Sequence, residues 1–98
     1  MSRRLIVRPD AESDLRDAIG WYESKRAGLG VDFADDVAVC FARIAANPEH
    51  YPFVARQIRK ARLRGFPYLV FFGDDGETIA VIAVMHGARN PTRWRRRA

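Results

Sequence analysis

The sequence predicts an α+β domain, in which an N-terminal strand and an antiparallel helical hairpin pack on an antiparallel β-sheet of three or more strands. Two observations predict this class. Apolar residues recur at helical spacing across the first half of the chain, and β-branched and aromatic runs separated by turn residues fill the second half. The 98 residues suffice for one hydrophobic core, so we expect a single domain over residues 1–98.

The chain begins with a predicted strand and a first helix. Residues 3–8 form the short strand, and Asp10 is the predicted N-cap of the helix that follows. Glu12 and Asp14 then lie near the positive end of the helix dipole, where acidic side chains are favourable. The helix has one apolar face, made of Ala11, Leu15, Ala18, Ile19 and Tyr22.

A second helix is predicted after Gly28 and Gly30, which break the first. Asn47-Pro48 ends this second helix, because proline disfavours a helical conformation in the residue before it. The connection between the helices is short, so they are expected to be antiparallel and to share one apolar seam. The stripe that the second helix contributes is Phe33, Val37, Cys40, Phe41 and Ile44.

Three strands are predicted in the second half. Residues 57–63 alternate loosely and are largely charged, which indicates an edge strand. Residues 68–72 are aromatic and β-branched, and residues 78–85 form the last strand. Residues 73–76, with the sequence Gly-Asp-Asp-Gly, make the turn of a hairpin between them.

The last strand is apolar on both faces. Strict alternation places Ile79, Val81, Ala83 and Met85 on one face and Ala80, Ile82, Val84 and His86 on the other. Two helices cover only one face, and each large apolar side chain left in water costs about 1.5–3 kcal/mol. The candidates for covering the second face are the first strand, the C-terminal segment around Trp94, a homodimer or another protein. We expect another protein.

Positive charge is concentrated in the second half. Residues 1–49 carry a balance of −2 and residues 50–98 a balance of +7. This segregation favours a polyanion or an acidic protein as a partner. A solvated edge strand protected by charge is the alternative interpretation. Half of the ten cations of this part fall in one acid-free stretch between Glu49 and Asp74, namely Arg56, Arg59, Lys60, Arg62 and Arg64.

The composition excludes several classes of site and location. Cys40 is the single cysteine, so the chain has no internal disulfide and no multi-cysteine zinc site, and its helical spacing predicts a small core residue. We expect no metal and no cofactor. The N-terminal apolar run, Leu5 to Val7, is too short for a signal peptide, so a cytoplasmic protein with no membrane contact is expected.

Several short motifs follow one another along the chain in a recognisable order. They are Asp14-Leu15, Trp21-Tyr22, Gly28-Leu29-Gly30, Asn47-Pro48, Tyr51-Pro52, Phe66-Pro67-Tyr68-Leu69-Val70-Phe71, and the closing His86-x-x-Arg89-x-Pro91-x-x-Trp94. Together they cover nearly the whole chain, and the chain resembles the ParE/RelE superfamily of bacterial toxins from type II toxin–antitoxin (plasmid-stabilisation) modules. Within that superfamily it is most similar to the ParE branch.

The resemblance implies two protein partners. One is a cognate antitoxin, whose acidic or amphipathic C-terminal segment wraps the toxin. The toxin is expected to bind operator DNA only through this antitoxin. The other is DNA gyrase, which ParE-like toxins poison without catalysis. Antitoxin contacts are expected at Trp21, Tyr22, Tyr68, Val70 and Phe72. Target contacts are expected at Arg59, Arg62, Arg64, Arg89, Trp94 and Arg95.

The alternative is an enzyme. RelE-like members of the superfamily cut messenger RNA on the ribosome, and a nuclease here would use His86, Arg62, Arg64 and Arg89. However, their catalytic arginine corresponds to Tyr68 and their C-terminal catalytic tyrosine to a position near Trp94, whose indole cannot transfer the proton. No catalytic residue is therefore favoured.

Structural roles compete with these functional ones at several positions. His86 is also interpreted as a hydrogen-bonded residue at a strand end, Trp94 as a packing residue that pins the tail onto the sheet, and residues 95–97 as a frayed terminus. Two further functions stay open: a nucleic-acid-binding module, and an inactive toxin homologue that persists in a DNA-binding autorepressor complex.

Overall fold

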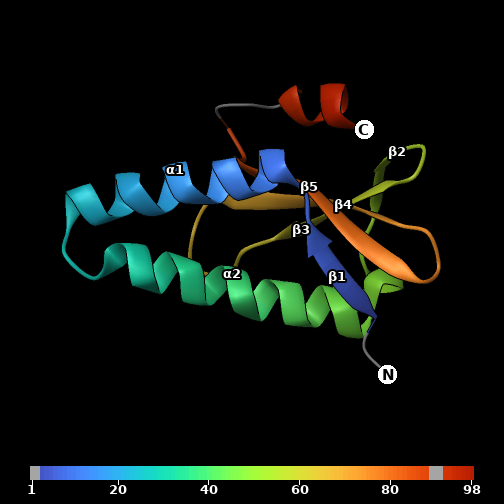
Figure 1. The fold of residues 1–98 in the computed structure, drawn as a ribbon, viewed down its shortest axis with the longest axis horizontal. Coiled ribbons are helices and arrows are strands. Elements are labelled where there is room, and N and C mark those ends of the chain that lie inside the picture. The colour runs from blue at the N-terminus through green and yellow to red at the C-terminus, as the bar shows by residue number, and fades with distance from the viewer. Residues whose placement is uncertain (1–2, 89–91) are drawn as a thin grey trace.

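The computed structural model describes residues 3–88 and 92–98. Two helices pack on one side of a five-stranded sheet with strand order β1-β5-β4-β3-β2 (Figure 1). The α+β class is confirmed, and the sheet is mixed rather than purely antiparallel. The elements are β1 (Arg4–Val7), α1 (Pro9–Lys25), α2 (Leu29–Ala46), the 3-10 turn η1 (Pro48–His50), β2 (Phe53–Ala55), β3 (Ile58–Arg62), β4 (Tyr68–Asp74), β5 (Thr78–His86) and the 3-10 segment η2 (Arg93–Arg97).

The sheet differs from the prediction at both edges. β1 lies parallel to β5, with Arg4 opposite Thr78, so the first strand forms one edge of the sheet beside the last strand. The charged strand β3 is not the other edge, because β2 pairs with it and the Lys60 N–H donates to the Pro52 carbonyl at 3.1 Å. The charges of β3 lie on side chains that project from a face, so they leave its backbone free to pair.

The two helices lie close together at Gly30. A Cβ atom there would lie 2.8 Å from the Ile19 carbonyl oxygen, so only glycine fits without a shift. The Glu23 carboxylate accepts hydrogen bonds from the Gly28 N–H, at 3.0 Å to its closer oxygen, and from the Gly30 N–H at 3.0 Å. Asp10 is not the N-cap of α1, because the helix begins at Pro9 and Asp10 lies within its first turn.

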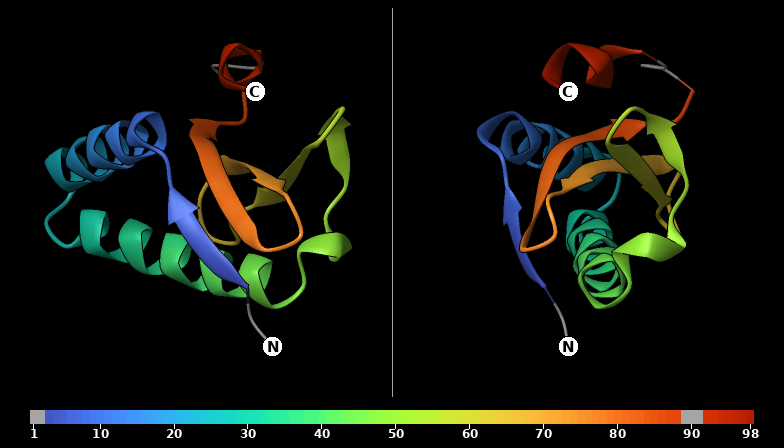
Figure 2. Two further views of the ribbon diagram at one scale, coloured as in Figure 1. Left: turned by 45° about the vertical axis from the view of Figure 1, so that its right-hand side comes forward. Right: turned by 90° about the vertical axis from the view of Figure 1, so that its right-hand side faces the viewer.

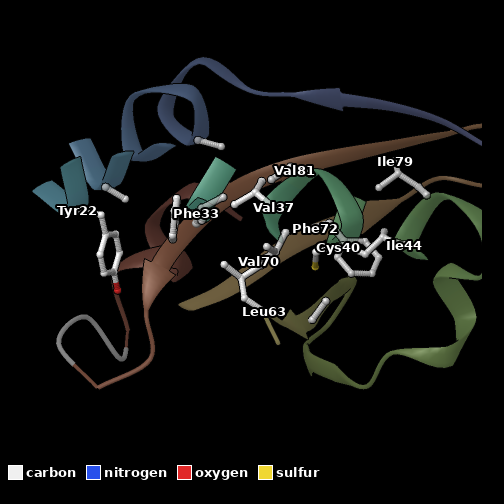
Figure 3. Packing of buried hydrophobic residues seen from close by; sticks show 14 residues of the cluster. Tyr22, Phe33, Val37, Cys40, Ile44, Leu63, Val70, Phe72, Ile79 and Val81 are labelled. Atoms are coloured by element: carbon white, nitrogen blue, oxygen red, sulfur yellow. The ribbon is translucent and has the colours of Figure 1, made fainter. Parts of the chain in front are cut away.

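The main core lies between the helices and the sheet (Figure 3). The stripe of α2 meets inward side chains of β4 and β5, and the fully buried members include Phe33, Cys40, Ile44, Val70, Phe72, Ile79 and Val81. Burial raises the pKa of the Cys40 thiol to about 11, which keeps it protonated at neutral pH. The prediction that Cys40 is a small core residue is confirmed.

A β-bulge interrupts the alternation of β5. Phe71 lies opposite Ala83 and Phe72 opposite Val81, so Ile82 is the extra residue. The predicted strict alternation is therefore wrong beyond Val81. Val84 joins Ile79 and Val81 in the main core, whereas Ile82, Ala83 and Met85 belong to a cluster on the second face.

The C-terminal segment covers the second face of the sheet. Trp94 is 3% exposed and stacks on Phe71, with ring centroids 4.9 Å apart and ring planes 12° apart. Figure 2 shows η2 on the opposite side of the sheet from α2. The expectation that another protein covers this cluster is wrong for this structure, because the chain's own indole occupies the position. The buried members of the cluster are Ile58, Phe71, Ile82, Ala83, Met85 and Trp94.

Candidate functional site

A groove rich in positive charge lies beside Trp94 on the second face. It combines two adjoining cavities of about 360 and 320 Å³, which share Lys60, Leu69, His86 and Gly87. Arg62 and Arg95 lie at its two ends, and no acidic residue is among the described residues that line it. We call this surface the cationic groove. Its charge suits an anionic partner.

The register of β3 explains which cations enter the groove. Lys60 lies opposite Phe71 and Arg62 opposite Leu69, and residues directly opposite in a sheet share a face. Both side chains are exposed and project on the same side as the Trp94 cluster. Lys60, which the predicted target set omits, lines both cavities.

The other predicted cations are not brought into the groove. Arg59 lies opposite Phe72 and so faces the other side of the sheet. There its Nη1 donates a hydrogen bond to the Tyr51 carbonyl at 2.5 Å, and its guanidinium carbon lies 3.8 Å from the Phe53 ring centroid. Arg64 is exposed but lies beyond the end of β3 and outside the groove lining. Arg59 therefore ties β3 to the preceding turn, and the basic stretch does not form one surface.

His86 lies in the groove at the end of β5. It pairs with Tyr68 across the sheet, and their rings meet edge to face at 5.5 Å. Its Nδ1 accepts a hydrogen bond from the Ala88 N–H at 3.1 Å, which places the proton of the neutral ring on Nε2. This bond supports the structural interpretation of His86, while its position beside Lys60 keeps the imidazole within reach of a ligand in the groove.

The tail contributes one buried and one exposed member of the predicted target set. Trp94 pins the tail onto the sheet, as its packing interpretation predicts, and is too buried to contact a target in this conformation. Arg95 is exposed, and its guanidinium carbon lies 4.9 Å from the Trp94 ring centroid. Arg89, predicted in both the target and the nuclease sets, lies outside the described residues.

Most of the predicted antitoxin contacts are core residues. Val70 and Phe72 are fully buried beneath the helices, because they lie on the face of β4 that α2 covers. Tyr22 is buried against Phe33, with ring centroids 5.2 Å apart. These three side chains therefore belong to the core rather than to an exposed surface, and their contact with an antitoxin stays a prediction.

Trp21 and Tyr68 remain at the surface of the predicted antitoxin set. Trp21 is 42% exposed, and Tyr68 is half-buried. Both line a second, open groove of about 230 Å³ between α1 and the end of β5, together with Asp14, Asp17 and Arg93. We call it the α1 groove.

Within the described parts of the chain, no helix is both long and apolar enough to cross a membrane.

Comparisons with known proteins agree with this architecture. Residues 5–91 match the family model described as the ParE toxin of the type II toxin–antitoxin system, parDE. The chain is 32% identical over 96 residues to "Toxin ParE2" of two Mycobacterium tuberculosis strains, covering 93% of this chain and 88% of the relative. A solved structure titled "Chromosomal ParDE TA system from P. aeruginosa" has the same fold, with a TM-score of 0.77 at 15% identity, covering 87% of this chain and 96% of that one. The chain belongs to the ParE toxin family of type II toxin–antitoxin systems.

Proposed function

We propose that this ParE-family toxin poisons DNA gyrase by binding, without catalysis, and that a cognate antitoxin neutralises it. The observation that carries the non-catalytic part is the burial of Trp94 against Phe71. The aromatic residue of the tail is a packing element, and its indole N–H can only donate a hydrogen bond. The groove beside it supplies positive charge and an imidazole already hydrogen-bonded through Nδ1.

The cationic groove is the proposed contact with the target. Lys60, Arg62 and Arg95 line it from β3 and η2. Surface cations of this kind raise the association rate and set the orientation of an acidic partner. The contact is therefore expected to weaken as salt concentration rises.

A supercoiling assay with purified gyrase tests the proposal. Stoichiometric toxin is expected to inhibit supercoiling, and the Lys60→Ala/Arg62→Ala double variant is expected to inhibit at least tenfold less. Arg4→Ala/Arg16→Ala removes the same charge from exposed positions on β1 and α1, away from the groove, and should inhibit as the wild type does. Full supercoiling in the presence of wild-type toxin would refute the proposed target.

Neutralisation is proposed to involve the α1 groove. Type II toxins of this family pair with antitoxins in ParDE systems. Trp21 offers the largest exposed aromatic surface in this groove, and such residues dominate protein interfaces. Trp21→Ala is expected to raise the antitoxin concentration needed to restore supercoiling. An unchanged titration would exclude Trp21 from the antitoxin contact.

One observation favours a second candidate function, a ribosome-dependent mRNA endonuclease. His86 lies in the same groove as Lys60 and Arg62, which is the kind of arrangement that phosphodiester cleavage needs. This function predicts cleavage of messenger RNA in a translating extract, abolished by His86→Ala. Intact messenger RNA in that extract, with gyrase inhibited in parallel, would decide for the first proposal.

A further inference from the structure

The last arginine of the chain binds the first helix. Arg97 Nη1 lies 2.6 Å from Asp14 Oδ2, and Nη2 lies 3.1 Å from Oδ1, so the contact is bidentate. The two side chains are each 17% exposed, and Asp10 adds a longer contact at 3.7 Å to Nε. The hydrogen bond to Asp14 raises the pKa of the Arg97 guanidinium further. Paired contacts of this type fix orientation as well as supplying energy.

The same two side chains satisfy backbone groups of β5. Pairing between β1 and β5 ends at Val81, and the bulge follows at Ile82. Beyond that point the Val84 N–H donates to Asp14 Oδ2 at 2.9 Å, and Arg97 Nη1 donates to the Ile82 carbonyl at 3.1 Å. Asp14 and Arg97 thus replace the strand partner that this stretch of the β5 edge lacks.

We propose that Asp14 and Arg97 form a clasp that holds η2 across the second face of the sheet, and so places Arg95 beside Lys60 in the cationic groove. Trp94 lies three residues before Arg97, one turn of a 3-10 helix, so fixing Arg97 sets the indole over Phe71. Arg95 and Arg96 then project outward. Arg97 is a positioning residue, distinct from the cations that line the groove.

The clasp is expected to open without unfolding the domain. Within the described residues, the tail is held by one buried side chain, Trp94, and by the contacts of Arg97 with Asp14, Asp10 and the Ile82 carbonyl. The main core has a separate set of buried residues under the helices. Segments with few buried contacts open at a lower free energy than the whole molecule. Opening would expose Phe71 and Met85 and would separate Arg95 from Lys60.

Fluorescence quenching of Trp94 tests the clasp directly. In a Trp21→Phe background, Trp94 is the remaining tryptophan and reports on the tail alone. Arg97→Ala and Asp14→Asn are each expected to raise the acrylamide quenching constant at least threefold. Arg97→Lys should give an intermediate value, because an ammonium group cannot make the bidentate contact. Arg96→Ala removes the neighbouring charge and should leave quenching unchanged.

Two further readouts separate the possible outcomes. Far-UV circular dichroism should stay unchanged in every variant, which confines the effect to the tail. Quenching that stays at the wild-type value in both Arg97→Ala and Asp14→Asn would overturn the clasp. The effect of placing Arg95 in the groove rests on the proposed function. In the supercoiling assay, Arg97→Ala and Asp14→Asn are both expected to inhibit gyrase several-fold less than Arg96→Ala does. If wild-type toxin leaves gyrase unaffected, the proposed function fails, and the quenching result still decides the clasp.

Discussion

The two faces of the sheet are covered in different ways. One face lies under two helices of 17 and 18 residues, and each helix contributes at least three buried residues to one continuous core. The other lies under a 3-10 segment of five residues with one buried side chain, Trp94. Lys60, Arg62 and Arg95, the cations of the cationic groove, lie beside the second cover. The helical face therefore provides stability, while the tail-covered face can rearrange at lower cost and carries the proposed function.

Truncation in the main core should have the largest effect on stability. Phe72 is fully buried on β4, and Phe72→Ala is expected to lower the free energy of unfolding by about 3–5 kcal/mol. Guanidinium denaturation measures the loss. Phe53→Ala is the matched control, because Phe53 is 58% exposed on the edge strand, and it should cost less than about 1 kcal/mol. Equal losses in the two variants would contradict the assignment of the core.

Removal of the indole should distinguish the second face from the first. Trp94→Ala is expected to cost roughly 1.5–3 kcal/mol, which is the value of burying one large apolar side chain. Hydrogen exchange should show faster exchange in η2 and the end of β5, with protection kept in α2. Loss of protection throughout the domain would mean that both faces form one cooperative unit.

The helical cover should be sensitive to a single methyl group. Gly30→Ala places a Cβ atom against the Ile19 carbonyl oxygen, and overpacking of this kind costs about 1–3 kcal/mol. Gly20→Ala is the matched control in α1, because nothing lies within 4 Å of the added methyl group. Alanine has a higher helix propensity than glycine, so Gly20→Ala should stabilise the protein by up to about 1 kcal/mol. Thermal denaturation of the two variants should therefore shift in opposite directions.

The smallest expected effect is the pH dependence of the hairpin connection. The pKa of Glu23 is lowered, first by the hydrogen bond from Gly28 and then by that from Gly30. A lowered pKa in the folded state adds stability that is present above the ordinary value of 4.5 and is lost as pH falls through the folded value. The difference in melting temperature between wild type and Glu23→Gln should thus be largest near neutral pH and narrow in acid. A constant difference would exclude the carboxylate charge as the cause.

The helical face could be predicted from the sequence because its signals are local. The stripe from Phe33 to Ile44 repeats every three to four residues, and Gly28 and Asn47-Pro48 mark its ends. The motifs that resemble the ParE branch are likewise local, each spanning nine residues or fewer. Both inferences agree with the α+β architecture and with the family.

The second face could not be predicted because it depends on contacts between distant residues. β2 has three residues, too few for an alternating pattern, so β3 was expected at the edge. The bulge at Ile82 leaves no mark in an unbroken apolar run. Asp14 and Arg97 lie 83 positions apart. A signal was nevertheless present: Asp10 and Asp14 are four residues apart on α1, and both contact Arg97.

The parallel pairing of β1 with β5 has a consequence for how the chain is made. Arg4 can meet Thr78 only after about four fifths of the polypeptide has left the ribosome, and the tail follows later still. The helical hairpin can form early, because its contacts are close in sequence. The sheet is complete only when β5 is available to pair with β1. A translation product that stops before β5 would therefore lack both the pairing of the edge strand and the cationic groove, so the proposed target contact can form only in a chain that extends through β5.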